Sequence, residues 1–221
     1  MREVDEEYRR DQLLGFWNKW GRILVGAVIV GLVAFAGYLF FSHRSDTVAG
    51  QQGEQFDLAL ADAAQPTKAD PVLSKLATDG NPGYSAMARF NQAEALLNKK
   101  DVKGAAALYA AIVGDTKLPQ PFRDRALIQQ TIAEYDGLQP QQIIDRMKPL
   151  ATAESPWFGP AGELVATAYM QQGKRPEAGK IFAQIAQSKG YVPDTIRQRS
   201  VQMAGVLGVD ATDKTEEKKA Q

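Results

Sequence analysis

The sequence predicts an all-α protein in which one N-terminal transmembrane helix is followed by a solenoid of antiparallel helix pairs. The first observation is an apolar run from Ile23 to Phe41 that contains neither a charged residue nor a proline. The second is that Ala, Leu, Gln and Glu dominate from Gln51 onward, where apolar residues recur with helical spacing between turn residues. Roughly 180 residues follow the run, which is enough for one domain with a real hydrophobic core.

The apolar run has the length and the flanks of a membrane anchor. Its roughly 19 residues, at about 1.5 Å each, make a helix of just under 30 Å, which matches the hydrocarbon core of a bilayer. Trp17 and Trp20 precede it and Tyr38 lies near its far end, as is typical of the headgroup region. A cleaved signal peptide and a buried core helix are the alternatives. The long head of mixed charge and the poor cleavage site at 47–49 argue against the first, and the lack of a polar face argues against the second.

Basic residues predict the orientation of this anchor. Five of them precede the run, whereas only one, Arg44, follows it over a comparable distance. The positive-inside rule counts Lys and Arg, so the head is expected in the cytoplasm and the large domain on the other side of the membrane. We therefore expect a cytoplasmic stub (residues 1–22), a transmembrane helix (23–41), a translocated helical domain (42–207) and a disordered tail (208–221) without apolar periodicity.

Ala27, Gly31 and Ala34 lie on one face of the predicted anchor at i, i+4 and i+7. Small residues in this pattern let a second transmembrane helix approach closely, so they form a candidate contact face. The alternative is that Gly and Ala are simply common in membrane helices.

Composition excludes most catalytic and cofactor chemistry. The chain has no cysteine and a single histidine, His43, beside the anchor, so thiol catalysis, thiolate metal sites and a Ser-His-Asp triad are excluded from the domain. No phosphate-binding glycine motif occurs. Lys+Arg and Asp+Glu both number 26, which leaves no excess of positive charge for nucleic acid. We expect no catalytic residue, no metal and no cofactor, and hence a protein that is not an enzyme.

The helices of the domain follow from apolar spacing and from the breaks between segments. The firmest break is Asp79 to Gly83, and Pro71 and Pro193 suit helix starts. The expected helices cover residues 53–64, 70–78, 84–99, 102–113, 124–135, 141–150, 161–172, 177–188 and 194–207, the last of them as a cap.

Two of the expected helix pairs repeat each other. Equivalent residues are separated by 73 positions, as 166 − 93 and 182 − 109 both show. The pairs are Ala93 with Ala166, Leu96 with Tyr169, Ala105 with Ala178, Tyr109 with Phe182, and Ile112 with Ile185. Half of this offset is close to the 34-residue tetratricopeptide period. A degenerate unit should lie between them, with Ile143, Met147 and Leu150 in the places of Ala105, Tyr109 and Ile112.

These residues resemble the tetratricopeptide pattern A-x3-F/Y on the second helix of each unit. A small residue permits a close crossing of two helices, and the aromatic residue four positions later fills the space beside it. The pattern is clear in the two outer units and poor in the middle one. An ordinary α-helical bundle is the alternative.

The whole layout resembles the ancillary SecYEG translocon subunit family, in its members with a tetratricopeptide domain from Gram-negative inner membranes. The likeness rests on the head EVDEEYRRDQ before FWNKWGR, on the anchor, and on ARFNQAEALLNKKDVKGAAALYAAIV, and it extends from Val4 to Leu207. It implies a single-pass inner-membrane protein with a periplasmic domain. It further implies a non-catalytic accessory role in protein export, with translocon subunits and a periplasmic chaperone as partners and exported polypeptides as further candidates.

A peptide groove can be sketched from the same resemblance, because the first helices of tetratricopeptide units line the concave face. The candidate groove residues are Phe90, Glu94, Leu97 and Asn98 in one unit and Glu163, Thr167, Met170 and Gln171 in the other. Aromatic, thioether and amide groups adapt to varied partners. The alternative is that Phe90, Leu97 and Met170 pack against neighbouring helices.

Three other functions compete with an export accessory. One is a scaffold for envelope assembly or cell division, which the sequence separates poorly from the first. Another is an envelope hydrolase, which needs two convergent carboxylates that no predicted core-facing positions supply. The third is a rigid spacer without a groove.

Overall fold

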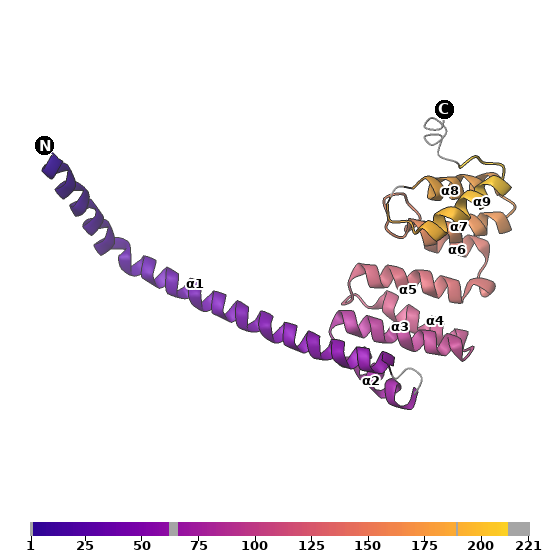
Figure 1. The fold of residues 1–221 in the computed structure, drawn as a ribbon, viewed down its shortest axis with the longest axis horizontal. Helices are drawn as coiled ribbons and strands as arrows, with labels where there is room; N and C mark the ends of the chain where they lie inside the picture. Colours follow the sequence, from indigo (N-terminus) through magenta and orange to yellow (C-terminus); the bar gives the residue numbers. More distant parts are fainter. Residues whose placement is uncertain (1, 62–65, 189, 212–221) are drawn as a thin grey trace. The chain divides into compact units, whose positions relative to one another are not determined.

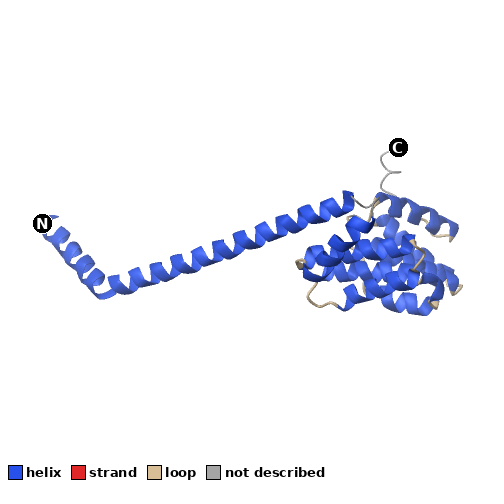
Figure 2. Cartoon of the chain, turned by 90° about the horizontal axis from the view of Figure 1, so that it is seen from below, coloured by secondary structure: helices blue, strands red, loops and turns tan. Residues whose placement is uncertain are grey.

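The computed structural model describes residues 2–61, 66–188 and 190–211, and every regular element in these ranges is a helix (Figures 1 and 2). A long apolar N-terminal helix is followed by packed helix pairs, which confirms the predicted fold class. The chain divides after Glu54 into two compact units.

The first helix, α1 (Arg2–Ala61), is longer than expected, since the helix predicted from Gly53 is its continuation. Gly50 and Gly53 do not interrupt it, because a single glycine costs a helix only about 1 kcal/mol and no proline lies between them. Residues 62–64 of the predicted helix lie outside the described residues. The described part from Trp20 has a mean hydropathy of 2.5 in its most apolar window, long and apolar enough to cross a membrane. A signal sequence would meet the same criterion.

The second unit begins where the end of α1 packs on two further helices, α2 (Pro66–Asp79) and α3 (Pro82–Asn98). Phe56 and Ala59 on α1 are buried with Leu73 and Leu76 of α2. The Phe56 and Tyr84 rings lie 6.1 Å apart, centroid to centroid, which ties this helix end to the start of α3. The final turn of α1 therefore belongs to the core of the helical domain.

The helices that follow start and end within a few residues of the predicted bounds. They are α4 (Val102–Gly114), α5 (Gln120–Ala133), the short 3-10 helix η2 (Tyr135–Gly137), α6 (Pro140–Met147), α7 (Phe158–Gln171), α8 (Arg175–Gln187) and α9 (Asp194–Val206). The Asn81 side chain accepts a hydrogen bond from the Tyr84 N–H (3.1 Å), and the Asp101 side chain accepts one from Gly104 (2.9 Å). Each satisfies a backbone donor that a helix start leaves unpaired.

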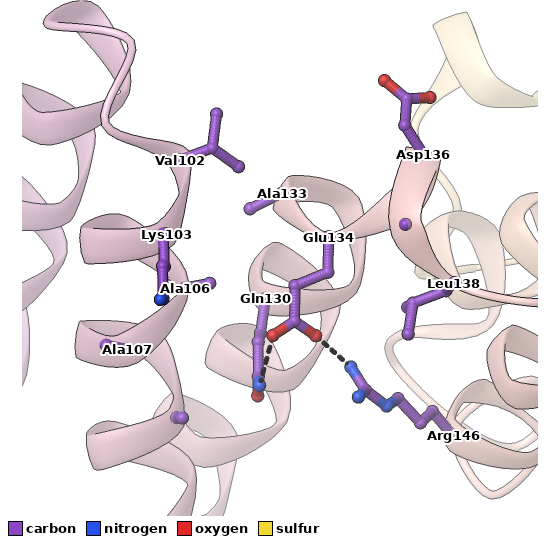
Figure 3. Close-up of a pocket in the computed structure, with 12 residues that line it drawn as sticks. Val102, Lys103, Ala106, Ala107, Gln130, Ala133, Glu134, Asp136, Leu138 and Arg146 are labelled. Atoms are coloured by element: carbon purple, nitrogen blue, oxygen red, sulfur yellow. Dashed lines mark hydrogen bonds and ion pairs between the residues drawn. The ribbon is translucent and has the colours of Figure 1, made fainter.

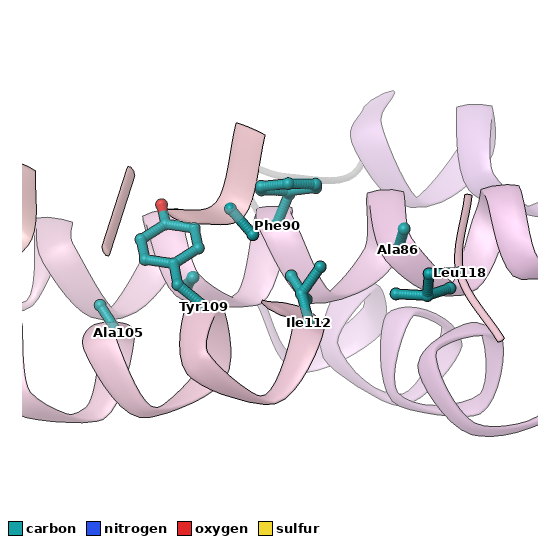
Figure 4. Packing of buried hydrophobic residues seen from close by; sticks show 8 residues of the cluster. Ala86, Phe90, Ala105, Tyr109, Ile112 and Leu118 are labelled. Carbon is teal, nitrogen blue, oxygen red and sulfur yellow. The ribbon is translucent and has the colours of Figure 1, made fainter. Parts of the chain in front are cut away.

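The two outer pairs, α3–α4 and α7–α8, cross on alanines. Ala93 and Ala105 are fully buried in one cluster, and Ala166 and Ala178 in another. Tyr109 packs in the first cluster at 5.9 Å from Phe90, ring centroid to centroid, and Ile112 and Leu118 extend it (Figure 4). The predicted Ala-aromatic pattern is therefore core packing in both units.

The middle pair, α5–α6, is built differently. The repeat places Thr131 and Ile143 where the outer pairs have two alanines, and both are fully buried. Their greater bulk keeps the two backbones apart. As a result α5 packs mainly on α4, α6 packs mainly on α7, and α5 and α6 have little close backbone contact with each other.

The packed domain extends slightly beyond the bound expected at Leu207. Val209 packs against the last cluster and Ala211 is buried in it, so the predicted tail is ordered over these residues. Gly179 on α8 makes room, since a Cβ there would lie 2.7 Å from the Val209 Cγ2 atom. Residues 212–221 of the predicted tail lie outside the described residues.

Candidate functional site

A mainly apolar groove of about 400 Å³ runs across the first helices of the last repeats, and we call it the α7 groove. Its lining includes Ile132 of α5, Tyr135 of η2 and Met203 of α9. Leu164 and Thr167 of α7, the middle helix of the three along the chain, also line it and are called its floor. Pro160, Glu163, Phe182 and Arg199 complete the lining. Ile132 is 49% exposed although it is apolar, which leaves an uncovered hydrophobic side chain at the edge of the groove.

One ion pair fixes the rim of the α7 groove. The Arg199 Nε and Nη2 atoms donate to the two Glu163 carboxylate oxygens at 2.7 and 2.6 Å, a bidentate arrangement that sets the guanidinium plane. The hydrogen bonds that Arg199 donates to Glu163, together with the negative charge of Glu163, raise the pKa of Arg199. Thr167 donates from its hydroxyl to the Glu163 carbonyl (2.8 Å), so its methyl group is left for the groove. The charges at the rim therefore satisfy each other and the floor stays apolar.

The first repeat has a related contact at the equivalent position. Phe90 and Glu163 are 73 positions apart, and in each case an arginine from a following first helix reaches the side chain. The Arg125 Cζ atom lies 4.6 Å from the centre of the Phe90 ring, a cation–π contact. Burial raises the pKa of Tyr109 beneath this contact, with Glu94 adding to the effect and Arg125 opposing it.

Among the described residues that line the groove, Tyr135 has a polar group whose burial is not compensated, its hydroxyl. It is buried without a hydrogen-bond partner among the described residues, and burial, followed by the charge of Asp136, raises its pKa. A buried hydroxyl without a partner is unfavourable, so a ligand that accepts a hydrogen bond there would relieve the cost.

A comparison with protein families finds a match over most of the sequence. The model of the tetratricopeptide repeat-like domain matches residues 15–203, which is most of the chain. The chain belongs to this family. Neither the curated proteins nor the solved structures contain a match. The tetratricopeptide-like domain implies protein partners in general and is typical of proteins without catalytic activity.

The eight residues predicted for a groove have different places in this tetratricopeptide-like domain. Glu163 and Thr167 line the α7 groove. Phe90 is buried and Leu97 packs against the same cluster, so both side chains hold α3 onto its neighbours. Met170 packs partly against the last cluster. Glu94, Asn98 and Gln171 are exposed on the surface.

Sequence reasoning missed the groove residues that come from α5, η2 and α9. Ile132 and Tyr135 belong to the eroded repeat, in which the sequence pattern aligns only residues of the second helix. Arg199 and Met203 belong to the capping helix, for which no repeat partner was expected. The spacing of Glu163 and Arg199 gives no local signal, since 36 positions separate them.

The predicted transmembrane contact residues Ala27, Gly31 and Ala34 all lie at exposed positions on α1. A Cβ at Gly31 would meet no atom within 4 Å. Their role as a contact face stays a prediction.

Proposed function

We propose that this protein is a membrane-anchored, non-catalytic interaction module that serves as an accessory to the Sec translocon and to periplasmic chaperones in protein export. The observation that carries the proposal is the α7 groove, whose apolar floor and preset Glu163–Arg199 rim suit a peptide segment with an apolar side chain. Apolar anchors in pockets provide most of the binding energy of such contacts.

The apolar part of α1 supports the membrane component of the proposal. Residues 23–41 would be retained as the anchor, residues 1–22 would lie in the cytoplasm, and the helical domain would lie in the periplasm. The basic residues before the run and the single one after it support this orientation. The partners follow from the resemblance of head, anchor and repeats to ancillary translocon subunits.

Affinity purification tests the proposal. The full-length chain with a C-terminal tag is purified from gently solubilised membranes, and the proteins that accompany it are identified by mass spectrometry. We expect translocon subunits and a periplasmic chaperone, with the translocon subunits reduced when residues 23–41 are replaced by an unrelated anchor.

A pair of variants tests the groove in the same experiment. Ile132→Asp places a charge at the edge of the apolar groove, while Val206→Asp places one at an apolar position that is 69% exposed and outside the groove lining. We expect only the first to reduce recovery of a soluble partner. Recovery of division or envelope-assembly proteins without translocon subunits would contradict the export role and favour the scaffold.

A further inference from the structure

A second and larger cavity, which we call the α4 cavity, lies between α4, α5, η2 and α6 (Figure 3). Its volume is about 720 Å³, within the range of roughly 300–1,000 Å³ that is usual for binding pockets. It uses Gln130 and Ala133 of α5 and Glu134 directly after this helix, whereas the α7 groove uses Ile132 of α5. Successive helix residues are about 100° apart, so Gln130 and Ile132 differ by about 200° around the axis. The two hollows are therefore on opposite sides of α5.

The α4 cavity follows from the erosion of the middle repeat. Where the outer pairs cross on two alanines, the middle pair has the bulkier Thr131 and Ile143, and α6 stays away from α5. The side of α4 that lies over this opening carries only small side chains beyond its first turn, namely Ala106, Ala107 and Ala110. Ala106 is buried, whereas Ala107 and Ala110 are exposed and leave the α4 backbone beside them accessible to a second helix at close range.

The walls of the α4 cavity carry charged side chains of both signs. The Glu134 carboxylate accepts from Arg146 of α6 at 2.5 Å and from Gln130 at 3.3 Å, so these groups satisfy one another. Lys103 on the α4 wall and Asp136 on the η2 wall form no ion pair with any described residue. Among the described residues, a cation at one wall and an anion at the edge of the opposite wall are therefore without an ion-pair partner (Figure 3).

We propose that the α4 cavity is a second docking surface, which takes a helical segment of another protein. The segment would present a stripe of small or medium apolar side chains to the alanines. It would carry acidic side chains along the edge that faces Lys103 and basic ones along the edge that faces Asp136. Charge complementarity selects this occupant, because the paired charges fix its orientation and register in the cavity.

A display library of helix-forming peptides, randomised along one face and both edges, tests the proposal on the full-length chain in lipid nanodiscs. Peptides are selected on the unmodified protein and their affinities are then measured by fluorescence anisotropy. Ala107→Trp fills the cavity, and Ala111→Trp is the matched control, since Ala111 is an exposed alanine on the same helix outside the lining.

We expect enriched peptides with the predicted charged edges, whose affinity falls at least tenfold with Ala107→Trp and less than twofold with Ala111→Trp. The double variant Lys103→Glu, Asp136→Lys leaves the cavity open and keeps the test valid if Ala107→Trp lowers the melting temperature. It should prefer peptides in which the acidic and basic edges are exchanged.

Three outcomes would overturn the proposal: no enriched peptide, peptides whose affinity does not depend on Ala107 or on the charge exchange, or peptides released only by Ile132→Asp. The last would assign peptide binding to the α7 groove and would leave the proposed function intact. Failure of the α4 cavity is thus distinguishable from failure of the α7 groove.

Discussion

Equivalent residues in the turns of the two outer helix pairs have the same left-handed backbone conformation, which is strained in one of them. Lys100 has a φ of 63° and Gly173, which is 73 positions later, has a φ of 74°. The same left-handed turn therefore links both outer pairs, with glycine in one and lysine in the other. A side chain with a Cβ is disfavoured in this conformation by about 1 kcal/mol or more, whereas glycine adopts it freely.

Lys100→Gly should therefore raise the free energy of unfolding by about 0.5–1 kcal/mol. The greater conformational entropy that glycine gives the unfolded chain opposes this gain and makes it smaller. Lys99→Gly is the matched control, because Lys99 has a φ of −82° and glycine there should be neutral or destabilising. Urea unfolding followed by circular dichroism measures both. An increase for Lys99→Gly and none for Lys100→Gly would contradict this account of the turn.

Asp115 connects three helices through its carboxylate. The Lys117 N–H donates to it at 3.1 Å and the Arg89 Nη1 atom at 3.0 Å, and these two bonds lower the pKa of Asp115. Arg89 also donates to the Ala77 carbonyl at 3.2 Å, so the end of α2 is joined to the end of α4. The pair is partly exposed and links the helices at the surface of the domain.

Asp115→Asn should lower the melting temperature of the domain at neutral pH. Because the folded state lowers this pKa, the stabilisation by the carboxylate is complete above its unfolded value of about 3.9 and is lost as the pH falls through the lower folded value. The difference in melting temperature between the two proteins should therefore be constant above about pH 5, begin to shrink near pH 4, and vanish only below the lowered folded pKa. A difference that is as large at pH 3 as at pH 7 would contradict the assignment.

At the scale of helices, the size of the residue at each crossing decides how closely a pair packs. Alanines at both outer crossings bring the helices together, and Thr131 with Ile143 keeps the middle pair apart. The larger residues that replace alanine in the middle pair weaken the sequence repeat. The same residues open the α4 cavity, because they keep the two helices apart. The eroded repeat is a structural feature with a consequence for binding.

Ala105→Leu should destabilise the domain by about 1–3 kcal/mol, because a larger side chain at the fully buried α3–α4 crossing forces the helices apart. Ala111→Leu is the control on the exposed side of the same helix and should change stability by about 0.5 kcal/mol or less. Thermal unfolding of both variants measures the contrast. Equal effects of the two substitutions would show that the crossing does not depend on the alanine.

Helices were more predictable from the sequence than the groove they build. Periodicity, proline and glycine define each helix locally, and the positions of Ala105 and Tyr109 relative to Ala178 and Phe182 revealed the pairing. The sequence predicts a new helix at Gly53, but α1 continues through this residue, because a single glycine is only a weak helix breaker. Of the predicted groove residues, only Glu163 and Thr167 line the α7 groove. Arg199 and Ile132 reach it from other helices, whose register depends on packing between residues far apart in the sequence.

At the scale of the whole molecule, the orientation of the chain in the membrane is the proposal most open to a direct test. The absence of cysteine allows single cysteines to be introduced without background. Lys148→Cys lies at an exposed position of the domain and Gln12→Cys lies in the N-terminal stub. A membrane-impermeant maleimide should label only Lys148→Cys in cells with a permeabilised outer membrane, and both variants in detergent. Labelling of Gln12→Cys alone would show that the orientation is the reverse of the proposed one. A shortened chain would indicate a cleaved signal peptide.

Site-specific photocrosslinking most directly tests the central claim, that an anchored tetratricopeptide-like domain binds other proteins through its α7 groove. A benzophenone amino acid at Ile132, in the groove, is compared with one at Val206, which is also exposed and apolar but outside the lining. In intact membranes the account predicts discrete adducts with translocon subunits or a periplasmic chaperone from position 132 only, and fewer adducts with translocon subunits when residues 23–41 are exchanged. Equal adducts from both positions, or none from position 132, would contradict it.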